Sequence, residues 1–541
     1  MSGGLAAPGR LAPKSGAVDA GGPERCVRAA ERALDRVFGT VANPLRQLGA
    51  LTFWMLWIVV VSGFWIYALY ETSVDGAYRS VQTMTEQQPL AGGLMRSLHR
   101  YASDALIVLA LLHGVREAML GRFRAFRWYT WVSGVPLLPL ALASGVVGYW
   151  MVWDQRAQYT GVAVLEWLAW LPGFDAGMVR NFIDADAISD RFFSLLAFAH
   201  IGLPLSLLLG AWAHLLRLAR PHTQPVRTLA IGSTLMLAAL SLAWPARSLP
   251  AVDLALWPQR VEIDWFYLGM LPLADAAPRI AGVTATMLTL ALLALPWRPR
   301  RGTAPPAAVV DPAHCNGCTL CQADCPYGAI EMVPHVDGRV GVRMATVSAE
   351  LCAGCGICVG ACPSATPFRR AAPVATGIDL PQLPLATLRA QLDHALAALR
   401  AVGDGPRVIV LGCDRGATLD DRAPDPGVRV TAAGAAAMLG APCVALWPPV
   451  FIEYALRGGA DGVLVTGCPP ADCAYRLGAR WTAQRLAGER APHLRAQVPR
   501  ERVRLHWFLR EDKDALLRAV DNFQRTLAER MRDCQRTADT A

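Results

Sequence analysis

Four histidines stand inside apolar segments of this 541-residue chain, and they form two pairs with one spacing. His99 and His113 are 14 residues apart, and so are His200 and His214. Fourteen residues are close to four helical turns, so the members of a pair share one helix face, about 21 Å apart along the axis. Imidazole binds haem iron axially, and a polar side chain at membrane depth is a functional candidate. Two such helices face to face predict two stacked bis-histidine haem sites. The alternative is that each histidine is bonded to a neighbouring helix.

Glycines repeat the same period on two other apolar segments. Gly49 and Gly63 are 14 residues apart, and so are Gly134 and Gly148. A residue without Cβ lets a flat macrocycle approach the backbone, so these glycines are expected beside the two b-type haems. Guanidinium groups bind carboxylates in a bidentate manner, and three arginines near the histidines are expected to meet haem propionates. They are Arg96, Arg100 and Arg116.

The helices that must carry these residues can be located from hydropathy. Six apolar segments have, or nearly have, the roughly 20 residues that span a bilayer. They are Leu51–Tyr70, Tyr101–Leu120, Trp131–Met151, Phe192–Leu215, Leu229–Trp244 and Ile280–Trp297. The arginine-rich loops between them all fall on one side, which predicts cytoplasmic termini in a bacterial inner membrane. Membrane topology also explains the net charge of +9 better than nucleic-acid binding does. We expect an all-α, six-helix transmembrane bundle in contact with membrane lipid.

Twelve of the 14 cysteines follow residue 310 in tight groups, which is typical of metal binding rather than of disulfides. Two runs read C-x2-C-x2-C-x3-C-P, the spacing of bacterial two-cluster ferredoxins, in which the fourth cysteine of one run binds the other cluster. The predicted ligands of one 4Fe–4S cluster are Cys315, Cys318, Cys321 and Cys362. Those of the second are Cys352, Cys355, Cys358 and Cys325. Zinc is the alternative, but it needs only four ligands.

The last part of the chain alternates apolar strand-like runs with helical stretches, which predicts an α/β domain. Four further cysteines follow these runs or precede a helix, and we expect them to converge at one edge of the sheet. They are Cys413, Cys443, Cys468 and Cys473. Redox-inert buried cysteines are the alternative.

The membrane half resembles cytochrome b of the quinol-oxidising cytochrome bc complexes, above all the chloroplast and cyanobacterial type. Three motifs carry the resemblance: Arg96-Ser-Leu-His99-Arg100, Gly148-Tyr-Trp-Met-Val-Trp-Asp-Gln155 and His200-Ile-Gly-Leu-Pro204. The resemblance implies that His99 and His200 bind an outer-side haem, that His113 and His214 bind a cytoplasmic-side haem, and that the protein is a homodimer.

The same family has an outer quinone site with a Pro-Glu-Trp-Tyr motif, where this chain has Ile263-Asp264-Trp265-Phe266. The resemblance implies that Asp264 carries a proton for a quinone or quinol, with Trp265 in the same motif and Tyr149 beside the pocket. The alternative is that Asp264 is a loop acid facing water.

The stretch Gly459-Ala-Asp-Gly-Val-Leu-Val-Thr-Gly-Cys468-Pro-Pro-Ala-Asp-Cys473 resembles the delta subunit of methyl-viologen-reducing hydrogenase. Members of that family begin with a Cys-x-x-Cys, where this chain has Cys413 and Gly416. The resemblance implies one 2Fe–2S cluster on the four remaining cysteines. It also implies a cytoplasmic flavoprotein partner, of either the heterodisulfide-reductase type or the NAD(P)H-oxidoreductase type.

These expectations divide the chain into a disordered tail with an amphipathic helix (1–43), a cytochrome b bundle (44–300), a small α+β ferredoxin-like domain (308–370), a linker with a helix (371–404) and an α/β iron–sulfur domain (405–531). The predicted function is a quinone-linked oxidoreductase that joins a cytoplasmic flavoprotein to the quinone pool. Two alternatives stay open. One is a bifurcating bc-type complex with a separate Rieske protein, and the other is a membrane anchor for a cytoplasmic hydrogenase or reductase.

Overall fold

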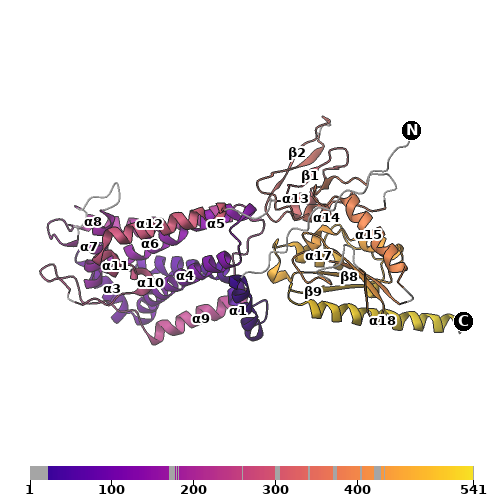
Figure 1. The fold of residues 1–541 in the computed structure, drawn as a ribbon. Coiled ribbons are helices and arrows are strands. Elements are labelled where there is room, and N and C mark those ends of the chain that lie inside the picture. The colour runs from indigo at the N-terminus through magenta and orange to yellow at the C-terminus, as the bar shows by residue number, and fades with distance from the viewer. Residues whose placement is uncertain are drawn as a thin grey trace. The chain divides into compact units, whose positions relative to one another are not determined.

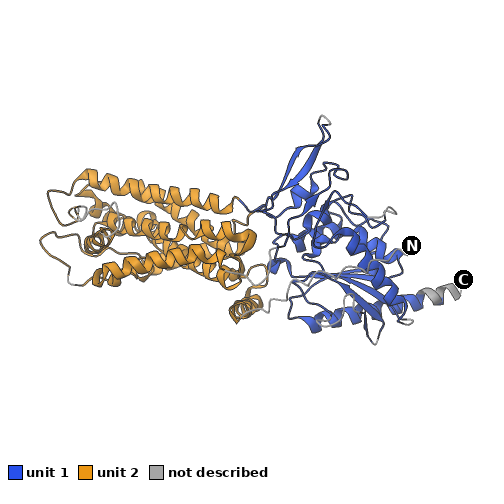
Figure 2. Ribbon diagram, turned by 45° about the horizontal axis from the view of Figure 1, so that its top comes forward, with its two compact units in different colours: residues 1–17, 217–220, 301–541 blue, residues 18–216, 221–300 orange. Residues whose placement is uncertain are grey.

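The computed structural model describes residues 22–169, 177, 180, 182–258, 260–298, 305–338, 341–368, 374–402, 405–419, 428–431 and 433–539. The chain divides into two compact units (Figure 2). Unit 2 spans residues 18–216 and 221–300, and unit 1 contains residues 301–541 with 217–220. Residues 1–21 of the tail expected at 1–43 lie outside the described residues, and the helix found in the rest of it is α1, Gly22–Phe38.

Unit 2 is all-α (Figure 1). Its long apolar helices correspond to the six segments expected from hydropathy. They are α2 (Leu48–Tyr67), α4 (Leu94–Met119), α5 with α6 (Trp128–Gly134 and Leu137–Val152), α8 (Asp190–Leu215), α9 (Arg227–Ala243) and α12 (Pro278–Ala294).

Four described helical stretches are long and apolar enough to cross a membrane: Pro44–Tyr67, Ala125–Val152, Asp190–Leu215 and Pro278–Trp297. The other two expected spans fall short for different reasons. Helix α4 has 26 residues but carries several charged side chains, and α9 has only 17 residues. Pro136 lies at the interruption between α5 and α6, since proline lacks the N–H that a continuous helix needs there.

Helix α2 packs on α4, and α5 and α6 pack on α8. The interior between them is apolar and includes Met55, Ile107, Ala141 and Leu207. Other helices of this unit lie in its connections: α3 (Gly76–Glu86), α7 (Gln155–Leu168), α10 (Trp265–Leu268) and α11 (Leu271–Ala276). Hydropathy did not indicate α7, because its residues are only weakly apolar on average.

The first part of unit 1 contains both predicted ferredoxin runs. It has two short helices, α13 (Leu320–Asp324) and α14 (Ile357–Ala361), each of which ends just before a cysteine of a Cys-Pro pair. Strands β2 (Ile330–Pro334) and β3 (Arg343–Val347) pair antiparallel, as do β1 (Val309–Val310) and β4 (Ile378–Asp379). This α+β content agrees with the expected class. Helix α15, Leu385–Arg400, follows as the expected linker helix.

The second part is an α/β domain with a five-stranded sheet in the order β6-β7-β5-β8-β9. The bounds are β5 Arg407–Leu411, β6 Val428–Val430, β7 Ala435–Leu439, β8 Gly462–Gly467 and β9 Val503–Trp507. Only β6 runs antiparallel to its neighbour. The helices are α16 (Val450–Arg457), α17 (Gly478–Ala487) and α18 (Lys513–Asp539).

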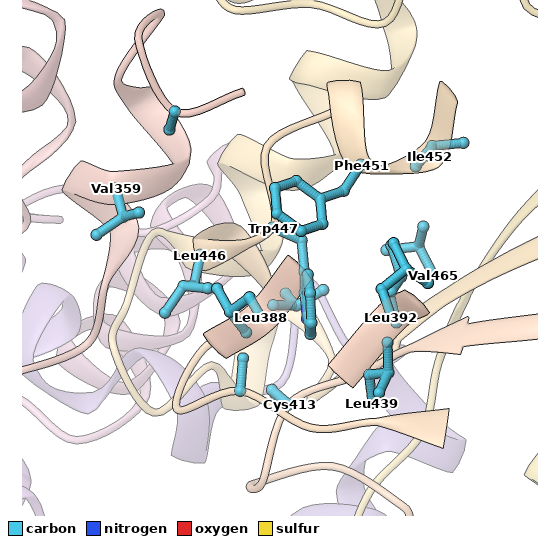
Figure 3. Close-up of a cluster of buried hydrophobic side chains, with 14 of the residues drawn as sticks. Val359, Leu388, Leu392, Cys413, Leu439, Leu446, Trp447, Phe451, Ile452 and Val465 are labelled. Atoms are coloured by element: carbon cyan, nitrogen blue, oxygen red, sulfur yellow. The ribbon is translucent and has the colours of Figure 1, made fainter. Parts of the chain in front are cut away.

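A continuous apolar core joins both parts of unit 1. Figure 3 shows its central side chains, with Trp447 and Phe451 beside Leu388 and Leu392 of α15. Cys413 belongs to this core, so the edge of the sheet where β5 ends is buried rather than open to solvent.

Candidate functional site: histidine pairs and cysteine sets

His99 of α4 faces His200 of α8, with ring centres 6.1 Å apart. Two imidazoles on opposite sides of one metal, at metal–nitrogen bonds of about 2 Å, have ring centres about 6 Å apart. The Nδ1 atoms of both rings lie 2.9 Å from backbone carbonyl oxygens, those of Val59 and Ser144. A ring that donates from Nδ1 keeps Nε2 free to bind a metal. The geometry of this pair therefore fits a bis-histidine haem.

His113 and His214 form the second pair and lie close enough to interact electrostatically. His214 is bonded through its ring to the backbone of Thr130, and its Nδ1 lies 3.2 Å from Oγ of Ser133. The Nδ1 atom of His113 is buried and has no hydrogen-bond partner among the described residues. Hydrogen bonds therefore fix the orientation of the His113 ring less than that of the other three rings.

Each of the four predicted glycines lies against one of the four histidines. A Cβ built on each glycine would lie close to the Cε1 atom of its histidine. The distance is 2.8 Å for Gly148 and His200, and 2.9 Å for Gly134 and His214. It is 3.1 Å for Gly63 and His99, and 3.3 Å for Gly49 and His113. Real Cβ atoms essentially never come within 3.0 Å of another heavy atom. The glycines thus make room for the histidine rings themselves, and their positions agree with a haem cradle.

Arg96 and Arg116, which are expected to meet haem propionates, both have partners within the protein. Arg96 is bonded to Oγ1 of Thr85 at 2.5 Å and to Oγ of Ser248 at 2.8 Å. Arg116 is buried and lies 2.6 Å from the carboxylate of Glu31 on α1. This ion pair attaches α1 to α4, because a buried carboxylate needs a cationic partner. The propionate roles of Arg96 and Arg116 stay predictions.

Arg100 also has a protein partner, and this contact defines the candidate quinone site. Its guanidinium forms an ion pair with Asp264 and another, at 2.5 Å, with Asp104. The Asp264 carboxylate also accepts a hydrogen bond from the hydroxyl of Tyr149. Only 4% of the Asp264 side chain is exposed, so this acid does not face water.

The sequence motif did not indicate every member of this cluster. Asp104 was missed, although an acid within an apolar segment is by itself a functional candidate and this one lies five residues after His99. Trp265, by contrast, was expected in the site, but its side chain is 71% exposed. It starts helix α10, for which Asp264 provides the N-cap by accepting a bond from the N–H of Phe266 at 2.8 Å.

The eight ferredoxin cysteines gather in the two predicted sets. Cys315, Cys318, Cys321 and Cys362 line one cavity. In the other set, Cys325, Cys352, Cys355 and Cys358 interact with one another electrostatically. Backbone N–H groups point at these sulfurs, such as that of Ala329 at 3.3 Å from Cys325 Sγ.

The surroundings of these thiols disfavour ionisation to thiolates in the absence of a metal. Burial first, and then the neighbouring cysteines, raise the pKa of Cys321 to about 12. Burial also raises the pKa of Cys355 and of Cys358. Four sulfurs at such a site become thiolates when cations compensate their charge, which is what the irons of a cluster do.

The four cysteines of the α/β domain meet at the carboxyl edge of the sheet. Cys413 follows β5, Cys443 follows β7 and Cys468 follows β8. Their thiols form a chain of hydrogen bonds: Cys413 with Cys468, Cys468 with Cys473, and Cys473 with Cys443. The hydrogen bond from Cys468 lowers the pKa of Cys413 to about 7, against the effect of burial.

Gly478 makes this site possible, since a Cβ there would lie 2.2 Å from Sγ of Cys443. Within the described residues, no group of three or more His, Cys, Asp or Glu side chains converges on a single metal ion. Ligands of an iron–sulfur cluster surround a cage wider than one ion, so the geometry of a single-ion site does not describe such sets.

The fold and these sites define a multi-pass membrane protein of electron transfer that binds haem of the b type and 4Fe–4S clusters. Residues 35–222 match the family model described as cytochrome b/b6/petB, and residues 314–366 match the 4Fe–4S dicluster domain. Residues 428–529 match the delta subunit of methyl-viologen-reducing hydrogenase. The first match ends before α9, and the last begins after Cys413.

Cytochrome b6 of Euglena gracilis is 31% identical over 174 residues, which are 31% of this chain and 80% of that protein. Cytochrome b6 of Mastigocladus laminosus is 35% identical over 113 residues, 21% of this chain and 52% of that protein, so the chain spans about half its length. The chain belongs to the cytochrome b/b6 family, in fusion with a 4Fe–4S dicluster domain and a domain similar to the hydrogenase delta subunit.

Among solved structures, a chain titled "Hyperthermophilic respiratory Complex III" is similar at 18% identity and a TM-score of 0.38. The similarity covers 50% of this chain and 81% of that one. A likeness at this level carries no argument about function.

Proposed function

We propose that this protein is a quinone-linked oxidoreductase of the bacterial cytoplasmic membrane, and one subunit of a larger complex. It connects a cytoplasmic flavoprotein to the quinone pool. His99 with His200 and His113 with His214 hold two b haems, the two ferredoxin sets hold two 4Fe–4S clusters, and Cys413, Cys443, Cys468 and Cys473 hold a 2Fe–2S cluster. These groups supply one-electron chemistry when bound.

The observation that carries the proposal is the match between histidines and glycines. Four histidine rings on α4 and α8 each lie against a glycine of α2, α5 or α6, at 2.8–3.3 Å from the position of the missing Cβ. A structural histidine needs no such partner, since a buried imidazole is satisfied by hydrogen bonds alone. Four repetitions of one arrangement support two sites built to one plan.

The quinone assignment depends on the contact of Asp264 with Tyr149 and Arg100. Asp264 would accept a proton from a quinol hydroxyl or return one to a quinone, because a carboxylate within hydrogen-bond reach of its substrate acts as a general base. Tyr149 holds the carboxylate in place, and its ring lies 4.9 Å from the guanidinium of Arg100. Membrane orientation, with both termini in the cytoplasm, follows from the arginine-rich loops.

The experiment uses the purified full chain in detergent, reduced with dithionite and freed of excess reductant. Visible difference spectra follow the haems and EPR follows the clusters while a menaquinone analogue is added. We expect the quinone to reoxidise both kinds of centre in the parent, and much more slowly in Asp264→Asn. Haems that stay reduced in the parent would contradict a quinone link. Equal rates in Asp264→Asn would move the quinone site elsewhere.

A further inference from the structure

Arg485 is a fully buried cation that no part of the proposed chemistry uses. It lies on α17 with 1% of its side chain exposed. Its Nη2 atom is 2.5 Å from the carboxylate of Asp324, which is itself 2% exposed. Arg490 also forms an ion pair with Asp324, from a less buried position. Burying such charges costs desolvation free energy, so we expect a role of Arg485 and Asp324 other than stabilising the fold.

The guanidinium of Arg485 contacts three chain segments, and each carries a cysteine of a proposed cluster site. Asp324 directly precedes Cys325. Nη2 also lies 3.4 Å from the carbonyl oxygen of Ile357, which directly precedes Cys358. Nη1 donates to the carbonyl of Ala445 at 2.8 Å, two residues after Cys443. One side chain therefore links the backbone of the second 4Fe–4S set with that of the four-cysteine set of the α/β domain.

The two cysteine sets meet at this point through close backbone packing. A Cβ on Gly360 of α14 would lie 1.9 Å from the carbonyl oxygen of Ala445 and 2.7 Å from Nη1 of Arg485. A Cβ on Gly356 would lie 2.3 Å from Cδ1 of Leu446. The contact is near enough that the thiols of Cys443 and Cys355 interact electrostatically. Only glycine allows α14 to approach the turn at Val444–Leu446 this closely.

A guanidinium suits this junction for two physical reasons. Its planar fork can bond to several acceptors at once, which fixes the segments relative to one another. Its positive charge also stabilises additional negative charge nearby, and a reduced cluster carries one more electron than an oxidised one. Outer-shell hydrogen bonds, charge and burial are the means by which a protein sets the reduction potential of an iron–sulfur cluster. Arg485 also interacts electrostatically with Cys443.

We propose that Arg485 is a positioning residue for both sites: it holds the four-cysteine set and the second 4Fe–4S set in one fixed arrangement and raises the reduction potentials of both. This inference rests on the proposed cofactor set. It assigns the second 4Fe–4S cluster, held by Cys325, Cys352, Cys355 and Cys358, as the neighbour of the 2Fe–2S cluster.

The test compares the full-length chain with Arg485→Met and Arg485→Lys. Methionine keeps the volume and removes the charge, while lysine keeps the charge and loses the fork. The matched control is Arg495→Met, because Arg495 also pairs with a carboxylate of this domain, Glu453 at 3.1 Å, but is 56% exposed. Iron and sulfide content, EPR spectra of the reduced chain and redox titration of each signal are measured.

In Arg485→Met we expect parent-like iron content, lower midpoint potentials of the 2Fe–2S and second 4Fe–4S signals, and weaker magnetic interaction between them. The first 4Fe–4S signal keeps its potential. Arg485→Lys recovers the potentials but not the interaction, and Arg495→Met behaves as the parent.

Unchanged potentials in Arg485→Met overturn the proposal. Loss of all clusters in both Arg485 variants, with an intact Arg495→Met, shows a role in folding alone and also overturns it. A parent chain without any 2Fe–2S signal contradicts the proposed cofactor set and this inference together. If the parent shows both the 2Fe–2S and the second 4Fe–4S signal, and Arg485→Met leaves their potentials unchanged, only the role of Arg485 is contradicted.

Discussion

Gly148 of α6 lies directly against the ring of His200 on α8, where a Cβ would be 2.8 Å from the ring carbon Cε1. The ring position depends on this missing side chain, because the neighbouring helices already pack closely. The same relationship recurs at the other three histidines. Haem capacity is thus encoded on both partners of each helix pair, and the first prediction addresses the glycine.

We predict that Gly148→Ala lowers haem content at the His99–His200 site. Alanine favours an isolated helix over glycine by about 1 kcal/mol, so a loss of haem would come from the clash and not from a weaker helix. Haem is measured by the pyridine haemochrome assay. The control is Gly202→Ala on α8, where a Cβ meets nothing within 4 Å. Equal haem in both variants would contradict the cradle.

His113→Ala should remove the haem of the second pair and leave the His99–His200 haem in place, so that haem per chain falls to about half. The two sites are independent because about 21 Å of helix axis separates His99 from His113 on α4, and His200 from His214 on α8. Haemochrome assays and redox titration count the remaining haem. The exposed His222, outside the helices, provides the control variant His222→Ala. Parent haem content in His113→Ala would refute the assignment.

Cys468→Ser should abolish the EPR signal of the 2Fe–2S cluster while both 4Fe–4S signals persist. Cys468 contacts both Cys413 and Cys473, so its loss breaks the site in the middle. Serine keeps the size of the side chain but is a poor iron ligand. The exposed Cys26 provides a cysteine control, Cys26→Ser. If the 4Fe–4S signals disappear instead, the cysteine sets are divided wrongly.

The last prediction concerns membrane voltage. Moving one charge across the whole membrane is worth about 2.3 kcal/mol per 100 mV. In the proposed orientation, with the iron–sulfur sites in the cytoplasm and the Asp264 site at the outer side, net electron movement would cross the membrane. An inside-negative potential then helps flow from the cytoplasm outward and opposes the reverse. Turnover in sealed, energised vesicles should therefore change when an ionophore collapses the potential, and the sign of the change gives the direction.

This measurement needs the flavoprotein partner and a quinone to be present together. Unpermeabilised and permeabilised vesicles provide the comparison, since only the former hold a potential. An ionophore without any effect would mean that the quinone reacts on the cytoplasmic side, and that Asp264 serves a different purpose.

Sequence periodicity alone indicated the histidines, the glycines and the ferredoxin cysteines, because each belongs to a short repeat whose period matches helix geometry or cluster spacing. The equal spacing of 14 residues required helices of at least four turns, and α4 and α8 have 26 residues each. The order of strand and cysteine also predicted that Cys413 and Cys468 would meet at one sheet edge, since parallel strands end together. Strand β7, which precedes Cys443, was not predicted from the sequence.

Only the tertiary structure decided the partners of individual charged side chains. Arg116 pairs with Glu31, 85 residues earlier in the chain, and no sequence pattern indicated this contact. Asp104 joins Asp264 through Arg100, and Arg485 joins segments that lie 128 and 161 residues away. Such contacts have no period, because they depend on which helices pack together. Local spacing is a property of one element, whereas charge pairing is a property of the packed fold, and it is therefore visible only there.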